Sequence, residues 1–159
     1  MAELIYWDSD ACIGWFQEDA GKVDLCKATL DRAESGEVVI VVSALVLAET
    51  LWLRGQAPIP KDKSEVVHKF FRRSYFRAKN VTRKTAESAQ KLVWEHGIKP
   101  KDAIHVATAL EHGVPVLETF DAELIEKSGS VGEPPLLIRK PQPPKQGSLD
   151  LVHGPKKTS

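Results

Sequence analysis

Residues 38–53 have the sequence VVIVVSALVLAETLWL, and this stretch is the clearest indication of the class of fold. Its first five residues are apolar and β-branched, which predicts a strand that is buried on both faces. Such strands are typical of parallel sheets that are covered by helices on both sides. Ser43 follows the strand and is a good N-cap for a helix over residues 44–53. A strand that leads directly into a helix favours an α/β fold.

The rest of the chain continues this alternation of strands and helices. Further strands are expected at residues 4–7, 114–117 and 136–138. Helices are expected within 11–34 with a break at Gly21, after the cap Ser64 to about 71, over 83–96 after the cap Thr82, over 101–111, and around 122–126 after the cap Asp121. Residues 76–81 are compatible with either a strand or a loop. The sequence therefore predicts an α/β fold with a parallel sheet.

The composition is that of one soluble globular domain. The chain has 159 residues, of which 42% are hydrophobic and 28% charged, and its acids and bases balance at 22 each. A neutral total neither supports nor excludes a nucleic-acid partner. The N-terminus has no basic region typical of a signal peptide, and no apolar run is long enough for a membrane span. We therefore expect a cytoplasmic protein with no membrane association.

Two further features concern the cysteines and the C-terminal end. Cys12 and Cys26 are the only cysteines, too few for a disulfide framework or a zinc site, and we expect two buried thiols. Residues 141–159, PQPPKQGSLDLVHGPKKTS, are rich in proline and glycine and have little to bury. We expect them to form a mobile tail after a folded domain at residues 1–140.

Four acids occupy positions where a carboxylate has a chemical use. Asp8 directly follows the first strand and Asp121 lies just beyond the third, and the carboxyl ends of parallel strands line the ligand crevice. Asp102 lies in the first turn of a helix, whereas Glu49 lies within an otherwise apolar helix. The aspartates can also be explained as helix caps or turn residues. Glu49 is harder to explain in that way, because a carboxylate buried alone is very costly.

A cluster of these acids suits a hard divalent cation. Mg²⁺ and Mn²⁺ prefer oxygen ligands, mostly carboxylates and water. Such ions activate a water molecule and stabilise the leaving oxygen in phosphodiester hydrolysis. If the four acids come together in the fold, they could hold one or two such ions for phosphodiester hydrolysis.

Four stretches of the chain, in order and at matching spacing over about residues 3–127, resemble the PIN-domain nucleases, including the VapC-type ribonuclease toxins of toxin–antitoxin pairs. They are IYWDSDACI at 5–13, VVIVVSALVLAETLWL at 38–53, GIKPKDAIHVATALEHGVPV at 97–116 and ETFDAEL at 118–124. The third is the most specific, with its acid–Ala start and its Ala-rich helix. The resemblance implies a three-layer α/β/α fold with a central, mostly parallel sheet flanked by helices.

The same resemblance implies a function. Asp8, Glu49, Asp102 and Asp121 would hold Mg²⁺ or Mn²⁺ as the catalytic acids of an endoribonuclease, with Ser9 and Thr119 as supporting hydroxyls. The expected partners are an RNA substrate, an antitoxin protein and a second copy of the chain in a homodimer. The alternative is a PIN-like module that binds RNA or protein without catalysis. Asp10 departs from the common pattern, as an extra site acid or, as we favour, a turn residue.

Residues 69–84, KFFRRSYFRAKNVTRK, form the most basic stretch of the chain. Aromatic residues lie between the basic ones, so the stretch is either an RNA-binding surface, with Arg72, Arg73 and Arg77 as candidates, or a helix with an aromatic core face. The two interpretations are compatible. His105 follows Asp102 at helical spacing and either contacts the site or, as we favour, packs beside the sheet.

Overall fold

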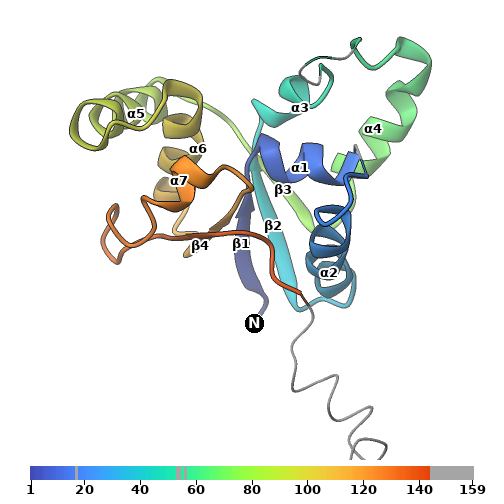
Figure 1. Cartoon of the computed structure of the whole chain (residues 1–159), viewed down its shortest axis with the longest axis horizontal. Helices are drawn as coiled ribbons and strands as arrows, with labels where there is room; N and C mark the ends of the chain where they lie inside the picture. Colours follow the sequence, from blue (N-terminus) through green and yellow to red (C-terminus); the bar gives the residue numbers. More distant parts are fainter. Residues whose placement is uncertain (17, 53–54, 56, 144–159) are drawn as a thin grey trace, which may run out of the picture.

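A five-stranded parallel sheet forms the centre of the chain in this computed structural model, which describes residues 1–16, 18–52, 55 and 57–143 (Figure 1). The strands are β1 Glu3–Trp7, β2 Val38–Ser43, β3 Phe76–Lys79, β4 Val116–Glu118 and β5 Leu137–Arg139. They lie in the order β3-β2-β1-β4-β5, and every neighbouring pair is parallel. The chain therefore builds outward from β1 to β3 on one side and returns to the other side with β4.

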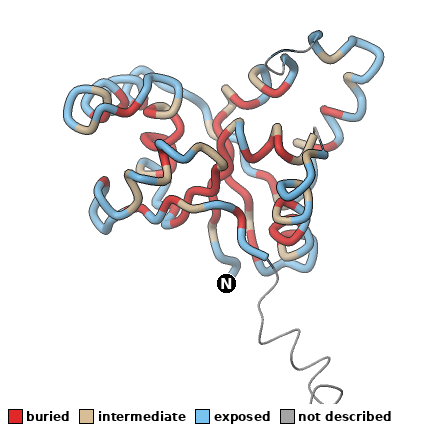
Figure 2. The backbone as a smooth tube through the Cα atoms, viewed as in Figure 1, coloured by how far each residue is buried: buried red, intermediate tan, exposed pale blue. Residues whose placement is uncertain are grey.

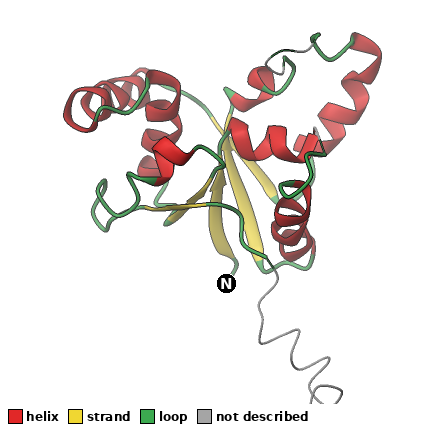
Figure 3. Cartoon of the chain, viewed as in Figure 1, coloured by secondary structure: helices red, strands yellow, loops and turns green. Residues whose placement is uncertain are grey.

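The helices cover both faces of this sheet (Figures 1 and 3). They are α1 Ser9–Phe16, α2 Val23–Glu34, α3 Val46–Glu49, α4 Ser64–Phe71, α5 Arg83–His96, α6 Pro100–Glu111 and α7 Ala122–Ile125, with a 3₁₀ turn at Lys61–Lys63. The first two pack on one face, and α5, α6 and α7 pack on the other. The expected three-layer α/β/α fold with a parallel sheet is confirmed.

Alternate residues of β1 divide the core into two halves. Ile5 and Trp7 face the layer of α1 and α2, whereas Tyr6 faces the layer of α6. All three side chains are fully buried, and Figure 2 shows that burial follows the strands and the inner sides of the helices. Because β1 and β4 are neighbours whose connections leave toward opposite faces, a crevice is expected at their carboxyl ends. Asp8 and Thr119 follow these two strands directly.

The helix predicted over residues 44–53 is much shorter in the structure, where α3 covers only Val46–Glu49. Ser43 ends β2 and is not the N-cap, although its hydroxyl accepts a hydrogen bond from the Leu45 amide at 3.1 Å. The Thr50 hydroxyl donates back to the Val46 carbonyl at 2.9 Å. Such bonds between side chains and backbone compete with a regular helix. Residue 53 lies outside the described residues.

Other boundaries differ by a few residues or fill in what the sequence left open. Residues 76–79 of the ambiguous stretch form β3, because the free edge of β2 offers hydrogen-bonding partners that a local pattern does not reveal. The third and last strands lie one or two positions later than predicted. Ser64 begins α4, but its N-cap is Lys63. The caps Thr82 and Asp121 are confirmed, and Thr82 forms a capping box with Thr85.

The remaining sequence expectations concern thiols, membranes and the tail. Cys12 and Cys26 are free and buried, as expected, and burial raises the pKa of the Cys26 thiol to about 12. None of the helices in the described ranges has both the length and the apolarity that a membrane crossing needs. Residues 144–159 of the expected tail lie outside the described residues, so the boundary at 140 stays a prediction.

Candidate active site

Asp8 lies at the carboxyl end of β1 and is almost completely buried, with 1% of its surface exposed. Its Oδ1 accepts a hydrogen bond from the Ala11 amide at 3.0 Å, in the manner of an N-cap for α1. The pKa of Asp8 is raised to about 7, mainly by burial and also by the nearby charge of Asp10, although His105 and a hydrogen bond with Thr119 oppose the rise. A carboxyl in this setting takes up a proton near neutral pH unless a cation compensates its charge.

Asp102 and Asp121 lie against each other although they come from different helices. Asp121 caps α7 by accepting a hydrogen bond from the Glu123 amide at 3.0 Å, and Asp102 is in the first turn of α6. Burial, the charge of Asp121 and a hydrogen bond with Asp121 raise the pKa of Asp102 to about 6. Because two ionised carboxylates cannot hydrogen-bond to each other, this contact needs either a shared proton or a cation.

Thr119 connects Asp8 with Asp121. Its side chain is fully buried directly after β4, and its hydroxyl accepts a hydrogen bond from the Asp121 amide at 3.1 Å. The same hydroxyl interacts with the carboxyl of Asp8 and lowers the pKa of that group. Ser9, the other expected hydroxyl, is the first residue of α1.

Glu49 reaches the site from the end of α3, and only 12% of its side chain is exposed. Its Oε1 lies 3.0 Å from Nε2 of His105, and its Oε2 lies 3.7 Å from the ammonium group of Lys101. Its negative charge raises the pKa of Asp10 and of Cys12. The carboxylate that was hardest to explain from the sequence is thus paired with a histidine and a lysine of α6.

Asp10 lies near these acids at the start of a helix, and not in the loop turn predicted from the sequence. It lies in the first turn of α1, and burial followed by the charge of Asp121 raises its pKa, with Glu49 adding to the effect and Lys22 opposing it. The alternation of Asp8 and Asp10 around Ser9 was the available sign in the sequence. We call Asp8, Asp10, Glu49, Asp102 and Asp121 the acid cluster.

Glu118 is a buried carboxylate that does not belong to the acid cluster. It ends β4 with its side chain toward Trp7 and Thr29, whose side chains donate hydrogen bonds to its Oε1 at 2.8 and 2.9 Å. Burial raises its pKa, and Arg139, at 3.8 Å from Oε2, opposes that effect. Glu118 therefore ties β4 to the α1–α2 layer, while its neighbour Thr119 serves the acid cluster. Sequence reasoning had assigned no role to Glu118.

The donor chemistry of the acid cluster fits a hard divalent cation, because it offers only carboxylate oxygens and an adjoining hydroxyl. Among the described residues, no group of three or more His, Cys, Asp or Glu side chains is already close enough to hold a metal ion. The raised pKa values of Asp8, Asp10 and Asp102 reflect burial and mutual repulsion, both of which a cation would offset. The acid cluster therefore suits a divalent cation by the chemistry of its oxygen ligands and by its negative charge.

Most of the chain, including the acid cluster, matches a known protein family. The model of the PIN domain family matches residues 5–129, which contain the whole acid cluster. The chain belongs to the PIN domain family. The resemblance predicted from the four sequence stretches is confirmed.

Several solved structures share the fold of this PIN domain. VapC20 of Mycobacterium tuberculosis, described as a toxin that cleaves the sarcin–ricin loop, superposes with a TM-score of 0.60 at 18% identity and covers 75% of this chain and 91% of that chain. FitAcB of Neisseria gonorrhoeae gives 0.54 at 19% identity, with 86% and 97% coverage. FitAB bound to a DNA fragment gives 0.55 at 20% identity, with 86% and 94% coverage. No curated protein matches the chain.

The basic candidates lie away from the acid cluster of this PIN domain. Arg73 and Arg77 line a groove of about 680 Å³ together with residues that precede and begin β2. Arg73 donates a hydrogen bond to the Tyr75 hydroxyl at 2.8 Å, and Arg77 donates to the carbonyl of Ser74. Arg72 follows α4 and is exposed. Arg73 and Arg77 lie near the start of β3, whereas the acid cluster lies at the carboxyl ends of the parallel strands. The structure therefore does not bring these two arginines to the acid cluster.

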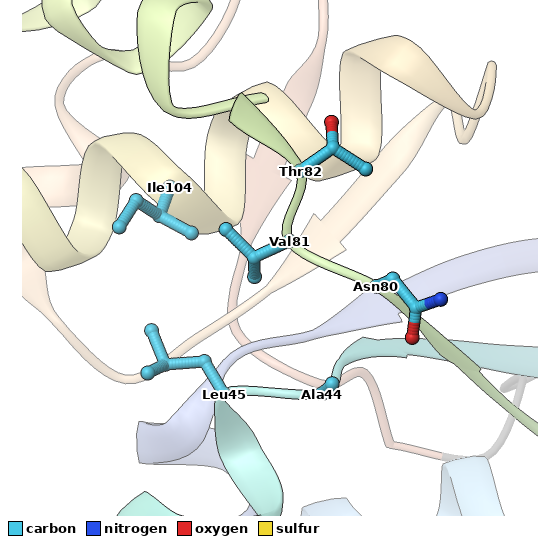
Figure 4. A pocket seen from close by; sticks show the side chains of 6 residues that line it. All are labelled: Ala44, Leu45, Asn80, Val81, Thr82 and Ile104. Atoms are coloured by element: carbon cyan, nitrogen blue, oxygen red, sulfur yellow. The ribbon is translucent and has the colours of Figure 1, made fainter. Parts of the chain in front are cut away.

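A second groove lies at the carboxyl ends of β2 and β3, the same end of the sheet as the acid cluster. It measures about 670 Å³ and is lined by Ala44, Leu45, Asn80, Val81, Thr82 and Ile104. Figure 4 shows the apolar side chains of Leu45, Val81 and Ile104 converging from three segments of the chain, with Asn80 at one side. The groove borders the site through α3 and α6. The Leu45 carbonyl accepts a hydrogen bond from the Glu49 amide at 3.1 Å, and Ile104 directly precedes His105 in α6.

Proposed function

We propose that this PIN domain is a metal-dependent endoribonuclease whose acids Asp8, Glu49, Asp102 and Asp121 hold Mg²⁺ or Mn²⁺. The observation that carries the proposal is the convergence of these carboxylates at the β1–β4 crevice, where burial and neighbouring acids raise the pKa values of Asp8 and Asp102. In structural ion-pair networks, the negative charges of buried acids are normally neutralised by Lys or Arg side chains. Here Asp102 hydrogen-bonds Asp121, a contact that a shared proton stabilises in the metal-free chain and that a bound cation would stabilise in its place.

The bound ion would supply an activated water molecule and would offset charge on the phosphodiester. The residues of the chain have separate tasks around it. Thr119 keeps Asp8 and Asp121 in register through its single hydroxyl. The exposed ammonium group of Lys101, beside Glu49, is placed to contact a phosphate of the RNA. Asp10 adds charge at the rim and strengthens the attraction of the site for cations.

The direct test is incubation of the purified chain with a mixed RNA pool in Mn²⁺, in Mg²⁺ and in chelator. We expect cleavage in either metal and none in chelator. Gel electrophoresis of the products measures the cleavage. A folded chain that binds RNA but cuts it under no condition would contradict the proposal and favour the catalytically inactive binding module.

Metal binding is expected to strengthen steeply as pH rises. A carboxylate must lose its proton before it can bind a cation, and the pKa values of Asp8 and Asp102 in the metal-free chain are about 7 and about 6. The affinity for Mn²⁺ should therefore rise by at least about tenfold between pH 5.5 and pH 7.5 and level off above that. Titration calorimetry over this range checks the expectation, and an affinity that does not change with pH would contradict it.

We further propose that the protein is the toxin of a toxin–antitoxin pair and acts in the cytoplasm as a homodimer. The printed description of VapC20 as a toxin supports this proposal. Exposed large apolar side chains on three helical regions, including Leu47, Val66 and Trp94, provide surface for a protein partner. Expression of the chain alone should arrest growth and degrade RNA, and normal growth with intact RNA would contradict the toxin role. Light scattering of the purified chain tests the dimer.

A further inference from the structure

The His105 imidazole has a protein partner on each of its two ring nitrogens. The residue lies on the inner face of α6 with 1% of its surface exposed. The Tyr6 hydroxyl lies 2.7 Å from Nδ1, and Glu49 Oε1 lies 3.0 Å from Nε2. Tyr6 itself is fully buried in β1. A continuous chain of hydrogen bonds therefore connects β1, α6 and α3, which are far apart in the sequence.

With a neutral imidazole ring, one arrangement of protons satisfies all three groups. An ionised carboxylate only accepts hydrogen bonds, so Nε2 must donate to Glu49. With the proton on Nε2, Nδ1 accepts from the Tyr6 hydroxyl, which fixes the tautomer and the plane of the ring. Tyr6 therefore orients His105, and His105 holds Glu49.

The short helix α3 cannot hold this carboxylate by itself. It has only four residues and no side-chain cap, and Glu49 is its last residue. A glutamate side chain loses considerable rotamer freedom when it is fixed. The partner of Oε2, Lys101, has a side chain that is 75% exposed and is a weak anchor. The buried imidazole is therefore the stronger restraint on the position of Glu49.

We propose that His105, oriented by Tyr6, is a positioning residue that occupies Oε1 of Glu49 and leaves Oε2 as the one oxygen that Glu49 offers to the divalent cation or to a water bound to it. The inference rests on the proposed function of the acid cluster. Residues that hold a metal-binding side chain in this way contribute strongly to metal affinity even though they do not touch the ion.

Two substitutions of His105 separate its two contacts. The amide group of Asn reaches the position of Nδ1, so His105→Asn keeps a partner for Tyr6 and removes the donor to Glu49. The longer Gln reaches the position of Nε2, so His105→Gln keeps the donor to Glu49. We expect the Asn variant to bind Mn²⁺ about 10- to 100-fold more weakly than the wild type, and the Gln variant to recover most of that loss.

The measurement is titration calorimetry with Mn²⁺ alone, without RNA, on the full chain. Thermal unfolding in chelator reports the structural cost of each variant separately. In a Glu49→Gln background, the Asn and Gln variants should bind Mn²⁺ equally, because the interaction through which His105 acts has been removed. If neither His105 variant folds, Tyr6→Phe decides, and it should weaken Mn²⁺ binding in the same direction.

The possible outcomes separate this inference from the proposed function. Folded Asn and Gln variants with equal Mn²⁺ affinity overturn the inference alone, provided that the wild type binds Mn²⁺ and cleaves RNA. Unchanged Mn²⁺ affinity in Tyr6→Phe, where that variant decides, also overturns it. A wild-type chain that neither binds Mn²⁺ nor cleaves RNA overturns the proposed function and the inference together.

Discussion

Asp102→Asn should lower the rate of RNA cleavage by at least about 100-fold while leaving the fold intact. Asn has the size of Asp and can still hydrogen-bond to Asp121, so the contact between α6 and α7 persists without the negative charge. The loss should appear mainly in kcat, because the removed charge acts on the metal ion and not on the bulk of the RNA. Single-turnover cleavage of a defined RNA at saturating Mn²⁺ measures it.

The matched control is Asp62→Asn, which removes an exposed acid from the 3₁₀ turn at Lys61–Lys63, outside the acid cluster. Its cleavage rate should stay within about twofold of the wild type, as expected for a surface change. Equal rates for the Asp102 variant, the control and the wild type would mean that Asp102 is not part of the site or that a contaminating nuclease cuts the RNA.

Asp8→Asn should stabilise the metal-free protein at pH 8. The pKa of Asp8 is about 7 in the fold against an ordinary value of 3.8, so between these values the folded state holds a proton that the unfolded state has released. The stability that this carboxyl contributes is fully present below about pH 4 and is lost as pH rises through about 7. Above that, the buried charge costs up to about 4 kcal/mol, which Asn avoids.

Urea unfolding in chelator checks this expectation at pH 8 and at pH 5. The Asn variant should gain on the order of 2–4 kcal/mol at pH 8 and much less at pH 5, where Asp8 is protonated in the fold. With saturating Mn²⁺ the order should reverse, because only the wild type gains binding energy. A variant that is less stable than the wild type at pH 8 in chelator would contradict the role assigned to the buried charge.

Local patterns predicted the parts of the fold that depend on neighbours along the chain. The β-branched run 38–42 forms a strand because its side chains need burial on both faces, and Thr82 and Asp121 cap helices because their side chains bond to amides two or three residues on. The extent of α3 escaped prediction because bonds from Ser43 and Thr50 to the backbone interrupt a segment whose periodicity is helical.

The site was predictable where an acid follows a strand and unpredictable where partners come from distant segments. Asp8 and Asp121 could be placed at the crevice because each comes just after a predicted strand of a parallel sheet. The pairing of His105 with Tyr6 and Glu49 joins residues 99 and 56 positions apart, which no local pattern encodes. Asp10 looked like a turn residue because its interaction with Asp121 exists only in the folded chain.

Anomalous diffraction at the manganese edge, from crystals grown with Mn²⁺, tests whether the acid cluster is a divalent-cation site. We expect an anomalous peak at the carboxyl ends of β1 and β4, with oxygens of Asp8, Asp102 or Asp121 as protein ligands. A peak only elsewhere on the chain, or none at saturating Mn²⁺ and pH 8, would contradict it.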